Sequence, residues 1–203
     1  MKLRYTTASP FSRKVLIVAH ECGLAGRIEK VPADLDHPEG DLANENPLGK
    51  VPTLVLDDGT ALIESPLICE WLEAQGNGVL IPREAKARTA ALQLQALGDG
   101  IGEAAICVQR ERNRMGPQHS DQVEARWQGK FDRAMDLLES DFDRRMAGAP
   151  NIGHVAIACA LGWVDFRMTN MDWRAKHPKL ARWYAEFARR PSMTATAPPA
   201  PKP

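Results

Sequence analysis

Residues 2–19, KLRYTTASPFSRKVLIVA, decide the fold of this chain. The first four residues of this stretch predict a short strand, and the apolar run from Arg13 to Ala19 predicts a buried helix. Between them lies a polar turn, residues 9–12 (SPFS), and Gly23 is suited to end the helix. The chain is therefore expected to begin with a strand, a turn that contains proline, and a helix.

This beginning is typical of a thioredoxin-like βαβ unit. In redox members of that architecture the turn carries Cys-x-x-Cys, because the N-terminus of the helix stabilises a thiolate. Here serine fills both cysteine positions, at Ser9 and Ser12. The turn therefore keeps the electropositive helix start but cannot form its own disulfide. Ser9 is able instead to donate a hydrogen bond to a thiolate that a ligand brings.

The composition excludes several classes of protein. The chain has 203 residues, and its 26 basic and 26 acidic residues cancel, so we expect neither a nucleic-acid nor an anionic-membrane surface. The cysteines stand singly, without zinc-ligand spacing or a disulfide framework, so we expect no metal. Because the start lacks a signal-peptide pattern and residues 15–19 are too few to span a bilayer, we expect a cytoplasmic protein.

The rest of the first half predicts a strand, a polar loop, a hairpin and a helix. These are expected at residues 27–31, at 34–46, at 53–56 paired with 60–63, and from Ser65 to about Gln75. Ser65 is expected to be the N-cap of this helix, with Pro66 at its first position. The order of elements in this half is therefore β-α-β followed by β-β-α.

The second half predicts helices throughout, so the fold class is α/β plus all-α. Apolar residues recur every three or four positions and predict helices at 83–114, 123–148, 152–166 and about 180–187. The helix at 152–166 is apolar nearly all round, which indicates the centre of the second domain. The expected domains are residues 1–78 and 88–194, with a linker at 79–87 and a disordered Ala/Pro-rich tail at 195–203.

Nearly the whole chain resembles the cytosolic glutathione S-transferases, and it resembles most the bacterial members with a Ser-Pro-Phe motif near the start. The resemblance rests on an ordered set of motifs: Ser9-Pro10-Phe11, Val51-Pro52, Glu64-Ser65, Asp99-Gly100, Arg110 to Arg114, Trp173-Arg174, His177-Pro178 and Arg190-Pro191-Ser192. Each motif alone is weak, but their order and spacing together are specific. The resemblance implies a thioredoxin-like N-terminal domain followed by an all-helical C-terminal domain.

The resemblance also implies a site for glutathione, with Ser9 as the catalytic residue that stabilises the thiolate of the bound tripeptide. The implied glutathione-binding residues are Phe11, Lys50, Val51, Pro52, Glu64 and Ser65. A cis Val51-Pro52 bond would present the backbone of Val51 to the peptide. The γ-glutamyl ammonium would meet Glu64, and its carboxylate would meet Ser65 and the helix N-terminus.

Structural alternatives remain open for several of these residues. Ser9 and Ser65 are alternatively helix caps, although Ser12 is better placed than Ser9 to cap the first helix. Lys50 is alternatively a solvated side chain. The resemblance further implies that Asp99 reaches glutathione across a dimer interface and that Arg110 lines the electrophile pocket. A solvated charged face at a helix end is the alternative for Arg110.

The implied function is that of a homodimeric glutathione transferase acting on a small hydrophobic electrophile. Two alternatives are a glutathione-dependent isomerase or peroxidase on the same scaffold, and a non-catalytic glutathione-binding or interaction protein. A disulfide reductase is not expected, because neither Ser9 nor Ser12 is cysteine.

One departure from the family concerns the central helix of the second domain. The family begins this helix with Ser/Thr-x-x-Asp, a reciprocal capping box, whereas here the residues are Asn151 to His154. Asn151 is a good N-cap, but histidine is a poor substitute for the carboxylate. We therefore expect a cost of about 1 kcal/mol that grows as pH falls, and a higher melting temperature for His154→Asp.

Overall fold

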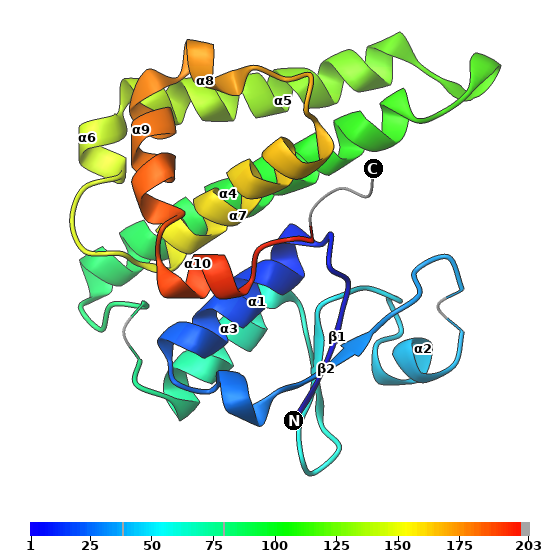
Figure 1. Cartoon of the computed structure of the whole chain (residues 1–203), viewed down its shortest axis with the longest axis vertical. Helices are drawn as coiled ribbons and strands as arrows, with labels where there is room; N and C mark the ends of the chain where they lie inside the picture. Colours follow the sequence, from blue (N-terminus) through cyan, green and yellow to red (C-terminus); the bar gives the residue numbers. More distant parts are fainter. Residues whose placement is uncertain (38, 79, 200–203) are drawn as a thin grey trace. The chain divides into compact units, whose positions relative to one another are not determined.

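The computed structural model describes residues 1–37, 39–78 and 80–199 (Figure 1). The chain separates into two compact units: Met1–Arg83 together with the segment that begins at Pro191, and Glu84–Arg190. The first unit contains a mixed sheet with helices, and the second is helical. This arrangement confirms the expected fold class of a thioredoxin-like domain followed by an all-helical domain.

The first unit is built on a mixed sheet. Its elements are β1 (Lys2–Tyr5), α1 (Pro10–Glu21), the 3₁₀ turn η1 (Ala25–Arg27), β2 (Glu29–Pro32), α2 (Asp41–Glu45), β3 (Thr53–Val55), β4 (Ala61–Ile63), α3 (Ser65–Gln75) and α10 (Pro191–Ala195). The strand order is β2-β1-β3-β4, with β1 and β2 parallel and the other two pairs antiparallel. The expected hairpin is therefore confirmed as β3 and β4.

The alternation of side chains along β1 separates the two faces of this sheet. Leu3 lies opposite Leu54 of β3, and neither side chain is exposed. The next residue, Arg4, points to the other face. There its guanidinium binds the carboxylate of Glu45 at 2.7 Å and that of Asp41 at 2.9 Å, both on α2. The short helix α2 is thus tied to one side of the sheet, while α1 and α3 lie together on the other (Figure 1).

The second unit is organised around one buried helix. Its elements are α4 (Ala85–Arg112), the 3₁₀ turn η2 (Gly116–Gln118), α5 (Asp121–Ser140), α6 (Phe142–Arg145), α7 (Ile152–Arg167), α8 (Trp173–Lys176) and α9 (Pro178–Phe187). Every residue of α7 from Ile152 to Val164 is buried, mainly against α4. The expected central helix is therefore confirmed. Among the described residues, no helix is long and apolar enough to cross a membrane.

The long helix predicted at 123–148 is wrong, because the structure breaks it in two. Helix α5 ends at Ser140, and the short α6 follows Asp141, whose carboxylate binds Arg144 and Arg145. Met146 after the break is still buried in the same core. The apolar spacing therefore continues across the break and conceals it in the sequence.

The segment around Ser192 and Met193 packs against α1 in the first unit. Ser192 donates a hydrogen bond to Glu21 at 2.5 Å, and Arg13 donates one to the carbonyl of Met193 at 3.0 Å. Residues 191–194 thus lie with the first unit, although the sequence assigned them to the helical domain. Of the tail expected to be disordered, Ala195 ends α10, residues 196–199 are described next to α1, and residues 200–203 lie outside the described residues.

The start of α7 corrects the expectation for His154. The Asn151 side chain accepts hydrogen bonds from the backbone N–H groups of Gly153 at 2.9 Å and His154 at 3.3 Å. In return, Nδ1 of His154 accepts from the Asn151 N–H at 3.1 Å. The capping box is therefore complete, because a neutral imidazole supplies the acceptor that the carboxylate supplies elsewhere. The ring is buried beside Trp183 and Phe187.

Candidate functional site

Three chain segments meet at one end of the sheet. Arg4 of β1 lies opposite Thr53 of β3, and Thr53 lies opposite Ile63 of β4. At this end β1 leads into the turn before α1, β3 is entered from Val51-Pro52, and β4 leads into the start of α3. The register therefore brings together the segments that carry Ser9, Phe11, Val51, Pro52, Glu64 and Ser65.

Ser9 lies at the start of α1, and its hydroxyl oxygen accepts one hydrogen bond while, among the described residues, its proton is not used. It is the N-cap residue, and its Oγ accepts a hydrogen bond from the Ser12 N–H at 3.1 Å. Its own N–H donates to the Thr6 carbonyl at 3.2 Å. Because this bond uses a lone pair of the Ser9 oxygen, the hydroxyl proton stays available for a second acceptor. The half-buried side chain also lies at the positive end of the helix dipole.

The expectation that Ser12 is the better cap of α1 is wrong. Helix α1 begins at Pro10, which suits the first helical position because it has no N–H to satisfy. Ser12 therefore lies within the first turn and is fully buried. Among the described residues, its Oγ has no hydrogen-bond partner. Capping and donation to a ligand are compatible roles for Ser9, because they use different parts of the hydroxyl.

The Val51-Pro52 peptide bond is cis, as the family resemblance implied. Pro52 is buried and Val51 is half-buried at the entrance to β3. Within the described part of the chain, neither the N–H nor the C=O of Val51 has a hydrogen-bond partner. The backbone of Val51 is thus available to pair with an extended peptide, as an additional strand does.

Asn46 holds the loop before Val51 and was not singled out in the sequence. Its Nδ2 donates to the Lys50 carbonyl and to Oγ1 of Thr53, both at 3.0 Å, and its Oδ1 accepts from the Leu48 N–H at 3.0 Å. The side chain is 1% exposed. An asparagine followed by proline marks a turn in sequence, but only the fold shows that this side chain organises the turn from inside.

The start of α3 differs from the expectation. The N-cap is Glu64 and Ser65 is the first helical residue, so the prediction of Ser65 as N-cap is wrong. Glu64 is exposed with a φ of 67°, whereas Ser65 is buried. Glu64 thus forms the single-residue connection between β4 and α3, one position before the predicted cap. The hydroxyl of Ser65 is therefore not explained as a cap.

The remaining predicted residues lie in different places. The Lys50 side chain is exposed, and Phe11 is half-buried in the first turn of α1. Asp99 is half-buried and Arg110 exposed, and both lie on α4 in the second unit. The neighbouring arginines of the predicted charged run bind carboxylates: Arg112 binds Glu124 at 2.7 Å and Arg114 binds Glu111 at 3.2 Å.

Two of the four cysteines have raised pKa values, which disfavour their thiolate forms. Burial, reinforced by the carboxylate of Glu73 at 3.2 Å, raises the pKa of Cys22 to about 12. Burial also raises the pKa of Cys107. Among the described residues, no three histidine, cysteine or acidic side chains are grouped to hold a metal ion. The Ser9 turn combines partial exposure with a helix N-terminus and carries no cysteine, so a thiol at this position would come from a ligand.

Comparisons with known proteins agree with this architecture. The sequence profile of the glutathione S-transferase N-terminal domain matches residues 8–75, and that of the glutathione S-transferase C-terminal domain matches residues 121–186. An Escherichia coli K12 protein described as the uncharacterized GST-like protein YibF is 32% identical over 203 residues, which cover 98% of this chain and 99% of that protein.

Two crystal structures of a glutathione transferase family member from Pseudomonas fluorescens Pf-5 are also similar. One, with bound glutathione, is 40% identical with a TM-score of 0.93 and covers 98% of this chain and 99% of that one. The other, with bound S-(propanoic acid)-glutathione, is 39% identical with a TM-score of 0.88 and covers 98% and 100%. Because the likeness in sequence and in fold extends over nearly the full length, the chain belongs to the glutathione S-transferase family.

Proposed function

We propose that the protein is a glutathione transferase in which Ser9 stabilises the glutathione thiolate for attack on a small hydrophobic electrophile. One observation carries the proposal: a serine hydroxyl with a proton to donate stands at a helix start, at the same end of the sheet as Val51 and the Glu64-Ser65 turn. The glutathione found in the Pseudomonas fluorescens relative supports it.

Ser9 would act on the acidity of the bound thiol. A free cysteine thiol has a pKa of about 8.5, so only a few per cent of it is thiolate at neutral pH. A hydrogen bond to a charged group contributes about 1.5–3 kcal/mol, and one pKa unit corresponds to about 1.36 kcal/mol. The Ser9 hydroxyl and the start of α1 would thus raise the thiolate fraction by about tenfold. The thiolate then forms a carbon–sulfur bond, and the leaving group departs with its electron pair.

The other segments would hold the tripeptide in place. The γ-glutamyl carboxylate would receive the hydroxyl and N–H of Ser65 at the start of α3, and Glu64 would bind the ammonium group. The backbone of Val51, set by Pro52, would pair with the cysteinyl residue of glutathione. Lys50 would meet the glycine carboxylate, and Phe11 would pack beside the peptide.

The helical unit would contribute residues that contact the electrophile. Arg110 is proposed to line the electrophile pocket, and Asp99 to approach glutathione across the interface of a homodimer. From the composition, we also propose that the protein acts in the cytoplasm and needs no metal ion. The S-(propanoic acid)-glutathione bound by the Pseudomonas fluorescens relative supports transfer over isomerisation, because a thioether of glutathione is the kind of product that thiolate attack leaves.

The decisive experiment is a titration with glutathione at neutral pH that follows the ultraviolet absorbance of the thiolate. Wild type is expected to bind glutathione with a thiolate signal, and Ser9→Ala is expected to bind it with that signal reduced about tenfold. Binding without any thiolate signal in wild type would overturn the transferase mechanism and favour a non-catalytic binding protein. Absence of binding would overturn the glutathione site itself.

A matched control separates chemistry from capping. Ser9→Ala also removes a helix cap, which costs about 1 kcal/mol. Ser120 is the N-cap of α5 and accepts from the Val123 N–H at 3.4 Å. Ser120→Ala is therefore expected to lose comparable stability while keeping the thiolate signal. Ser9→Thr, which keeps a hydroxyl, is expected to retain both the cap and most of the signal.

A further inference from the structure

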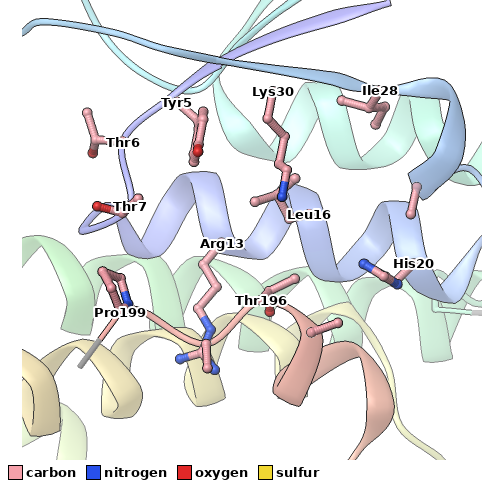
Figure 2. A pocket seen from close by; sticks show the side chains of 13 residues that line it. Tyr5, Thr6, Thr7, Arg13, Leu16, His20, Ile28, Lys30, Thr196 and Pro199 are labelled. Atoms are coloured by element: carbon pink, nitrogen blue, oxygen red, sulfur yellow. The ribbon is translucent and has the colours of Figure 1, made fainter.

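A cavity of about 180 Å³ lies along α1 in the first unit (Figure 2). One wall is a stripe of α1 that carries Arg13, Leu16 and His20, spaced by three and four residues. The end of β1, the strand β2 and the segment after α10 complete it. Ser9, the N-cap of α1, lies four residues before Arg13 on the same side of the helix, just outside the lining of the cavity.

The charges that line the cavity are all of one sign. Arg13 and Lys30 are cationic, and among the described residues no aspartate or glutamate lines the cavity. One nitrogen of the Arg13 guanidinium binds the Met193 carbonyl, but its Nε is buried without a hydrogen-bond partner in the described part of the chain. Figure 2 shows Lys30 descending from β2 toward Leu16 of α1. In the same view the Arg13 guanidinium points toward the segment after α10, so the two cations line different parts of the cavity. A carboxylate is the group that either cation would attract.

The rest of the lining and the volume restrict the body of the ligand. Leu16, Ile28 and Pro199 offer apolar surface, and Thr6 and Thr7 offer hydroxyls at the end near α1's start. A cavity of about 150 Å³ holds benzene, whereas drug-sized ligands need about 300 Å³ or more. The cavity therefore fits a ring or a short carbon chain that carries one carboxylate, and it is too small for a second glutathione.

The cavity reaches the turn that carries Ser9. Thr6 lines the cavity, and its carbonyl accepts the Ser9 N–H at 3.2 Å. Arg13 follows Ser9 by about one helical turn, which is about 5.4 Å along the axis. A small acid whose carboxylate lies in the cavity would thus extend its other end toward the turn that carries Ser9.

We propose that this cavity binds a carboxylate carried by the otherwise hydrophobic acceptor, so that the preferred electrophiles are small aromatic or short-chain acids with an electrophilic carbon. The acceptor role rests on the proposed glutathione transfer, whereas carboxylate binding does not. Arg13 and Lys30 are specificity-determining residues in this proposal. They select the acceptor by charge, and Ser9 acts on the thiol.

The binding test is calorimetric titration of the full-length protein with benzoate, with benzyl alcohol as the neutral analogue. Benzoate is expected to bind at least tenfold more tightly than benzyl alcohol, with or without saturating glutathione. Lys30→Gln is expected to weaken benzoate about tenfold, whereas Lys86→Gln, an exposed lysine on α4, is expected to change nothing. Equal affinity for the two probes, or no effect of Lys30→Gln, would overturn the proposal.

The test of Arg13 needs a variant that keeps the fold, because the Arg13 guanidinium also donates a hydrogen bond to the Met193 carbonyl. Arg13→Lys retains the charge but loses the planar fork that matches a carboxylate. It is expected to weaken benzoate about fivefold while unfolding at the temperature of wild type. A melting temperature unchanged together with unchanged benzoate affinity would exclude Arg13 from the site.

The kinetic test compares 4-(chloromethyl)benzoate with benzyl chloride as acceptors for glutathione. The ratio of kcat/KM for the acid to that for the neutral electrophile is expected to exceed ten in wild type and to fall about tenfold in Lys30→Gln. Turnover of both electrophiles without this preference would overturn the acceptor assignment and leave the transferase function standing. Benzoate binding without turnover of either would overturn the transferase function and the acceptor role together, and leave a carboxylate site.

Discussion

Glu64 is a residue that carries backbone strain at the proposed glutathione site. It has a φ of 67°, and among the described residues it is the only non-glycine residue with a positive φ. Such a conformation costs about 1–3 kcal/mol for a residue with a side chain. Glycine would remove this cost but would also remove the carboxylate. The strain is consistent with a carboxylate that is needed for the ammonium group of glutathione.

Replacement of Glu64 is therefore expected to separate stability from binding. Glu64→Gly should raise the free energy of unfolding by about 1 kcal/mol, because glycine adopts a positive φ without strain. The same variant should bind glutathione about tenfold more weakly, measured by calorimetry beside urea unfolding. Glu64→Gln, which keeps the strain and loses the charge, should weaken binding without gaining stability. Wild-type affinity in Glu64→Gly would show that the carboxylate does not bind glutathione.

At the scale of elements, small residues set the contact between α4 and α7. A Cβ on Gly98 of α4 would lie 2.7 Å from the Ile157 nitrogen and 2.8 Å from Ala156 on α7. Two backbones approach here more closely than any larger side chain allows. Gly100 lies on the same helix, and nothing described lies within 4 Å of a Cβ built there.

These two glycines are expected to respond oppositely to the same substitution. Gly98→Ala should lower the free energy of unfolding by about 1–3 kcal/mol, because α4 and α7 must move apart. Gly100→Ala should raise it by up to about 1 kcal/mol, because alanine favours the helix and meets no neighbour. Urea unfolding of both variants measures the difference. A loss of stability in both would mean that helix propensity does not govern Gly100.

The complete capping box at the start of α7 changes the stability expected for His154→Asp. The gain expected for His154→Asp assumed that histidine leaves the box incomplete. Because Nδ1 of His154 already accepts the Asn151 N–H, aspartate would add no missing hydrogen bond and would lose the ring contacts with Trp183 and Phe187. The structure thus removes the reason to expect a higher melting temperature for that variant.

At the scale of the whole molecule, two histidines give opposite pH dependences to stability. Burial lowers the pKa of His154 in the folded state. The Glu111 carbonyl and the Asp121 carboxylate raise the pKa of His119. The contribution of His154 to the free energy of unfolding is therefore complete above about pH 6.5 and declines as pH falls. The contribution of His119 is complete below about pH 6.5 and declines as pH rises through its folded pKa.

One variant isolates the contribution of His154 to the loss of stability in acid. His154→Gln keeps an acceptor for the Asn151 N–H but does not titrate. Relative to this variant, wild type should lose free energy of unfolding as pH falls from about 7.5 to 5, at a rate of at most about 1.4 kcal/mol per pH unit. Denaturant unfolding across that range measures the difference, from which His119 cancels. A constant difference would show that His154 does not titrate on unfolding.

The sequence by itself determined the elements that are long or carry a strong local signal. The β-α-β and β-β-α order, the hairpin and the central helix α7 follow from periodicity and turn residues, which act over a few neighbouring positions. The family was indicated by the ordered motifs from Ser9 to Ser192, since spacing along the chain is a property of sequence. Short helices such as α8 and α10 were missed, because one turn is too brief for a periodic pattern.

Only the tertiary structure decided which residues meet. The strand register places the Ser9 turn, Val51 and the start of α3 at one sheet end, because pairing partners are chosen by burial across the sheet and not by neighbours in sequence. The same holds for Asn46, whose partners become visible only when the loop closes around it. The return of residues 191–199 to α1, which forms the cavity beside Arg13, depends on contacts about 180 residues apart, and local patterns carry no information over that distance.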